Sequence, residues 1–61
     1  MTKSEIREIQ SVRLYVAHNM VDTAARSLSG LIRAARTNKS RTELMEIAIE
    51  FGLTDQPDFI I

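Results

Sequence analysis

Acidic side chains are the first candidates for chemistry in this sequence of 61 residues. Glu43, Glu46 and Glu50 are spaced three and four residues apart, which places them on one face of a helix. Carboxylates grouped in this way could coordinate a hard cation, but such a site needs further oxygen ligands from a loop. No such loop stands beside them, so we expect a solvated or salt-bridged acidic face and neither a metal nor another cofactor.

Histidine and cysteine, which carry much nucleophilic and metal chemistry, are scarce. His18 is the single histidine and there is no cysteine, which leaves neither a Ser-His-Asp or Cys-His set nor a zinc site within one chain. A chain of this length also seldom encloses a substrate pocket. We therefore expect His18 to be a solvated surface residue and the protein not to be an enzyme.

Basic side chains form a second candidate surface. Between residues 23 and 41 there are five basic residues and no acid, and between residues 42 and 61 five acids and no base. The possible basic contact surface consists of Arg26, Arg33, Arg36, Lys39 and Arg41. These residues could grip phosphates without sequence preference, but no exposed aromatic side chains accompany them for base stacking. A helix-turn-helix is excluded because its recognition helix would be the acidic one, so we treat nucleic-acid binding as the alternative.

The charge segregation also has interpretations within the protein. Glutamates three or four residues apart on a helix repel one another by roughly 0.2–0.5 kcal/mol per pair, so a cationic neighbour is expected. The arginines of the preceding helix could pair with them along the rims of a helical hairpin, for ~0–1 kcal/mol each. The same charges could instead act between chains and steer a dimer or a partner, or have no specific role.

The apolar pattern and the caps predict an all-α fold of three short helices in a single domain, residues 1–61. The expected helices cover about residues 4–18, 23–37 and 41–51, followed by an extended tail over residues 53–61. A hydroxyl residue followed three residues later by Glu is a capping box.

This pattern begins the first helix at Thr2 and the third at Ser40, and Asp22 is expected to cap the second. Gly52 suits the left-handed residue that ends a helix, and Pro57 excludes further helix nearby.

The small size of the chain predicts a helical homodimer. A chain of this length buries only roughly 60% of the surface that it exposes when unfolded, and without disulfides a partner chain is a common reinforcement. We expect pairing through the first helix and the alanine-rich face of the second. The predicted core and dimer interface consists of Ile6, Ile9, Val16, Met20, Leu28, Leu31 and Ile32.

The apolar end of the tail is formed by Phe59, Ile60 and Ile61. We expect it to fold back onto the helices or across the dimer interface, or to act as a hook that docks in the groove of a partner. No membrane-spanning segment is expected, because apolar runs such as Leu14 to Ala17 are far below the ~18 residues required. Charged residues crowd the start of the chain, which argues against a signal peptide, and the lack of cysteine fits a cytoplasmic protein.

The sequence as a whole resembles the small proteins encoded between the exonuclease and excisionase genes of lambdoid bacteriophages. The resemblance lies in the opening MTKSEIREIQSVRLYVAHN and the ending FGLTDQPDFII. It implies a role in adjusting phage development, in particular the balance between lytic growth and lysogeny, or in acting on the infected host. It implies no catalytic residues, and the expected partner is a host or phage protein.

Overall fold

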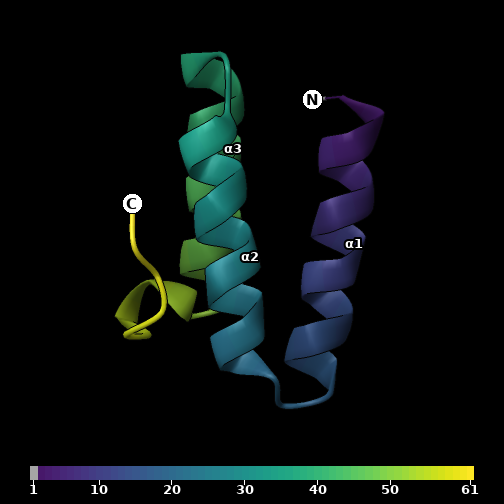
Figure 1. The fold of residues 1–61 in the computed structure, drawn as a ribbon, viewed down its shortest axis with the longest axis vertical. Coiled ribbons are helices and arrows are strands. Elements are labelled where there is room, and N and C mark those ends of the chain that lie inside the picture. Colours follow the sequence, from purple (N-terminus) through teal and green to yellow (C-terminus); the bar gives the residue numbers. More distant parts are fainter. Residues whose placement is uncertain (1) are drawn as a thin grey trace.

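Three α-helices and one short 3-10 turn make up the computed structural model, which describes residues 2–61 (Figure 1). The helices are α1 (Lys3–Ala17), α2 (Val21–Ala34) and α3 (Asn38–Glu50), and the 3-10 turn is η1 (Leu53–Asp55). α1 and α3 both run antiparallel to α2. The predicted all-α fold is confirmed.

The beginning of α1 is fixed by the predicted capping box at Thr2. The Thr2 hydroxyl accepts a hydrogen bond from the N–H of Glu5 at 3.2 Å, and the Glu5 carboxylate accepts one from the N–H of Thr2 at 3.1 Å. The helix ends before Asn19, whose φ of 60° lies in the left-handed region that Asn adopts more readily than most other residues. The predicted break between the first two helices therefore occurs at this residue.

The prediction that Asp22 caps α2 is wrong. The helix begins at Val21, Met20 occupies the cap position without a side-chain hydrogen bond, and Asp22 lies in the first turn. The left-handed turn at Asn19 lets the N–H of Met20 donate to the carbonyl of Tyr15 at 2.7 Å, so the chain reverses before it reaches Asp22. An acidic side chain in the first turn still interacts favourably with the helix dipole.

The prediction that Ser40 caps α3 is also wrong, because the helix begins one turn earlier. α2 ends at Ala34, three residues before the predicted end, and Thr37 is the next hydroxyl residue with an extended backbone. Its side chain accepts a hydrogen bond from the N–H of Ser40 at 3.1 Å. Arg41 then donates to the carbonyl of Ala35 at 3.4 Å, which ties the two helices together at their connection.

The core is built around α2, the central helix, against which α1 and α3 both pack. The buried residues of this core are Ile9, Val12, Ala24, Ala25, Leu28, Ile32, Leu44, Ala48 and Leu53. The alanine-rich face of α2, which was predicted to pair two chains, is thus covered within one chain. A homodimer would have to use another face.

The tail beyond α3 is shaped by Gly52, whose φ of 70° confirms the predicted left-handed residue. This conformation turns the chain so that Leu53 is fully buried in the core. Residues 53–55, which were predicted to be extended, therefore form the 3-10 turn η1. Phe59 packs half-buried against the core, whereas Ile60 and Ile61 are 62% and 60% exposed.

Candidate protein-binding groove

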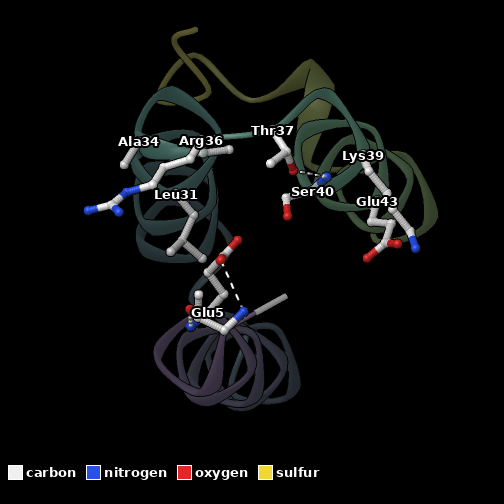
Figure 2. A pocket seen from close by; sticks show the side chains of 10 residues that line it. Glu5, Leu31, Ala34, Arg36, Thr37, Lys39, Ser40 and Glu43 are labelled. Atoms are coloured by element: carbon white, nitrogen blue, oxygen red, sulfur yellow. Dashed lines mark hydrogen bonds between the residues drawn. The ribbon is translucent and has the colours of Figure 1, made fainter.

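A groove lies between α1 and α3, because both helices contact α2 but their backbones do not contact each other. It contains two hollows of about 560 and 310 Å³. The larger hollow lies at the end of the molecule where α1 begins, α2 ends and α3 begins (Figure 2). The smaller hollow lies between the middle of α1 and Ile47 of α3.

The smaller hollow is lined by three isoleucines and two polar side chains. α1 contributes Ile6, Ile9, Gln10 and Arg13, and α3 contributes Ile47. Ile9 is 6% exposed and is therefore part of the core. Ile6 is 47% exposed, so about half of the Ile6 surface faces solvent. Complete burial of an isoleucine side chain stabilises a folded protein or a complex by roughly 1.5–3 kcal/mol. A partner that covered this part of the groove would gain a share of that free energy.

Glu5 contributes an unpartnered carboxylate oxygen to the larger hollow. Its Oε1 accepts the hydrogen bond from Thr2, but its Oε2 is shielded from solvent and has no hydrogen-bond partner within residues 2–61. Figure 2 shows this side chain directed into the space between the three helices, near Leu31, whereas the Arg36 guanidinium points away. A buried acceptor without a donor costs about 1–3 kcal/mol. An N–H donor that enters the hollow would be stabilised at this oxygen once the Glu5 carboxylate turns toward it.

Arg13 supplies the opposite charge two turns further along α1. Its guanidinium carbon lies 5.8 Å from the centre of the Phe51 ring, so the side chain reaches from α1 to the end of α3. A cation–π contact at an exposed site contributes roughly 0.5–1 kcal/mol. The wall that α1 contributes to the groove thus carries the carboxylate of Glu5 near the start of the helix and the guanidinium of Arg13 nearer its end.

The predicted ion pairs between the arginines of α2 and the glutamates of α3 do not form. Within residues 2–61 the one salt bridge joins Arg26 to Asp58 of the tail at 3.6 Å. By helical spacing, Arg26 and Arg33 lie on the side of α2 opposite buried Leu28, and Glu43 instead lines the larger hollow. Of the basic contact surface, Arg33, Arg36, Lys39 and Arg41 are exposed and none of the four has an acidic partner in the described part of the chain.

The residues predicted for the core and dimer interface fall into three groups. Ile9, Leu28 and Ile32 are buried, Val16 and Leu31 are partly buried against the core, and Ile6 and Met20 are about half exposed. His18 is exposed, as expected. In the predicted tail hook, Phe59 folds back and only Ile60 and Ile61 project into solvent.

The groove also contains residues that sequence reasoning missed as site residues. Glu5 was interpreted only as a cap, and Arg13 received no role. The spacing of eight residues between them, on one stripe of α1 with Ile9 midway, is a signal that could have drawn attention to this face.

Within residues 2–61, the histidine and the acidic residues do not form a metal site. No three His, Asp or Glu side chains converge there in a way that could hold a metal ion. None of the helices in that range is both long and apolar enough to cross a membrane.

No protein-family model, curated protein or solved structure matches the chain. A functional assignment therefore depends on the groove and on the charges around it.

Proposed function

We propose that this chain is a non-catalytic regulatory protein that acts by binding other proteins in the groove between α1 and α3. The observation that carries the proposal is the groove itself, which is lined by half-exposed Ile6, by Glu5 with its unpartnered oxygen and by Arg13. Apolar grooves flanked by a few charges are a common way to hold an amphipathic helix. The partner would be a protein segment with apolar residues at helical spacing.

The biological setting that we propose is a phage-infected bacterium. Support comes from the likeness of the opening and closing segments to small proteins of the lambdoid exonuclease–excisionase region. In that setting the chain would act in the bacterial cytoplasm on a host or phage protein. Its binding would shift the balance between lytic growth and lysogeny, or alter the infected host.

A pull-down from bacterial lysate tests this function, with two matched variants of α1. Ile6→Glu places a charge in the groove, and Leu14→Glu places the same charge at a side chain that is 61% exposed and does not line the groove. The wild-type chain and Leu14→Glu should retain a common protein that Ile6→Glu loses. Equal retention by all three chains would contradict the groove as the binding surface, and no retained protein would leave the proposal without support.

Nonspecific nucleic-acid binding is the second candidate, and one observation favours it. Arg33, Arg36 and Lys39 are exposed near the connection between α2 and α3 and have no acidic partner in the described residues. Such cations can release counterions from phosphates. A gel-shift at physiological salt would support this candidate if binding is clear and is lost when Arg26, Arg33 and Arg36 are changed to Ala.

A further inference from the structure

We infer that a second copy of this chain occupies the groove, with its α1 lying antiparallel to the α1 of the first copy. This inference rests on the proposed function, since it takes the groove as a protein-binding surface and names its occupant. It is carried by the charges along the molecule, by the pattern within α1 and by the length of the molecule.

The two ends of the molecule carry opposite charge. Where α1 begins and α2 connects to α3, six basic residues stand against three acidic ones, and the opposite end carries two basic and five acidic residues. The basic excess comes mainly from Arg33, Arg36 and Arg41, and the acidic excess from Glu46, Glu50 and Asp55. A parallel pair would bring like ends together, whereas an antiparallel pair brings each end beside its opposite.

The sequence of α1 is self-complementary in that orientation. Glu5 and Arg13 lie four residues on either side of Ile9. In a two-fold pair centred near Ile9, Glu5 of each copy meets Arg13 of the other, because a contact in such an interface occurs twice.

Arg13 would exchange its contact with the Phe51 ring for a charge-assisted hydrogen bond. Once the Glu5 carboxylate turns outward, the guanidinium would supply the donor that its Oε2 lacks.

The length of the molecule suits a second α1 laid along it. A helix of 15 residues is about 22 Å long at ~1.5 Å per residue, and the molecule is 29 Å along its longest axis. A second α1 would cover Ile6 of one wall and Ile47 of the other, both of which line the smaller hollow. Ile49, by helical spacing, lies on the side of α3 opposite Ile47 and would stay exposed.

Sedimentation of the purified chain from low to high micromolar concentration tests the inference. The wild-type chain should shift from monomer to dimer. Arg13→Glu would place a carboxylate against Glu5, and Glu5→Lys would place an ammonium against Arg13. Each change acts twice in the pair and should raise the dissociation constant about tenfold or more. The double variant Glu5→Lys with Arg13→Glu should return it to within a few-fold of the wild-type value.

Two controls separate dimerisation from folding. Glu5→Gln keeps a side chain that can accept the cap hydrogen bond but removes its charge, and circular dichroism reports whether each variant folds. If a charge variant unfolds, cysteine cross-linking replaces it, since the chain has no cysteine of its own. Under oxidation, Gln10→Cys near the two-fold axis should form a disulfide-linked dimer faster than Leu14→Cys does.

The outcomes that overturn the inference differ from those that test the proposed function. A chain that stays monomeric throughout the concentration range excludes the second copy, while the lysate experiment still tests binding of another protein. If neither charge reversal raises the dissociation constant, or if the double variant does not bring it back toward the wild-type value, the antiparallel arrangement is excluded. Equal cross-linking at positions 10 and 14 does the same.

Discussion

Two grooves run beside α3, and the chain fills only one of them. The groove between α2 and α3 receives η1, whose Leu53 packs against both helices and is fully buried. The groove between α1 and α3 receives no segment of residues 2–61, and Ile6 at its wall remains 47% exposed. One groove therefore contributes to folding, while the other offers apolar surface to another molecule.

The comparison shows that apolar residues on a helix do not all serve the core. Leu53 follows a helix end and could have been part of a loose tail, yet the turn at Gly52 carries it into the interior. Ile6 belongs to the predicted apolar stripe of α1 but lies where α1 and α3 separate. Residues 2–61 cover only about half of this side chain, so its complete burial depends on a partner.

The largest expected effect comes from truncating one side chain in each groove. Leu53→Ala should lower the free energy of unfolding by about 2–5 kcal/mol, because it leaves a cavity in the filled groove. Ile6→Ala should cost less than about 1 kcal/mol in the monomer, since half of that side chain already faces solvent. Urea unfolding at low micromolar concentration compares the two, and equal losses would contradict the distinction between the grooves.

A smaller loss should follow from Gly52→Ala, which affects the turn into the filled groove. An alanine at a φ of +70° is strained by about 1–2 kcal/mol. No atom lies within 4 Å of the added Cβ, so the whole loss would come from the backbone. Thermal unfolding measures it, and an unchanged melting temperature would mean that the turn is not held as described.

The cap of α3 distinguishes the observed helix start from the predicted one. Thr37→Ala removes the side chain that accepts from the N–H of Ser40 and should cost about 1 kcal/mol. Ser40→Ala lies inside the helix and should cost much less. Paired chemical unfolding curves decide between them, and the reverse order would restore the start at Ser40.

The smallest effect is expected at the ion pair that holds the tail. Arg26 and Asp58 are 69% and 38% exposed at their side chains and lie 3.6 Å apart. Their removal, singly or together, should change the free energy of unfolding by less than about 1 kcal/mol. A double-mutant cycle measures the coupling, and a much larger value would show that the tail depends on this pair rather than on Leu53 and Phe59.

Local signals predicted much of the fold. The capping box at Thr2, the break near Asn19 and the left-handed Gly52 each depend on residues close in sequence, and all three are present. The central position of α2 was not predictable from these signals, because it depends on which apolar stripes meet in three dimensions. The competition between Thr37 and Ser40 as caps was decided by where α2 ends, which is again set by packing.

The candidate site was less predictable for the same reason. Ile6 was expected at an interface, but the groove arises only because α1 and α3 both pack on α2 without contacting each other. The burial of the Glu5 oxygen follows from that arrangement and has no counterpart in the sequence pattern. The segregation of charge was visible at once, but its direction along the molecule required the antiparallel order of the helices.

The most direct test of the open groove is a map of backbone amide chemical shifts as the concentration of the chain is raised from micromolar to millimolar. The chemical shifts should change and saturate along one wall at Ile6, Gln10 and Arg13 and at Ile47 of the other, with little change at Ile49 or Arg33. Shifts confined to the exposed face of α2, or none over this range, would contradict it.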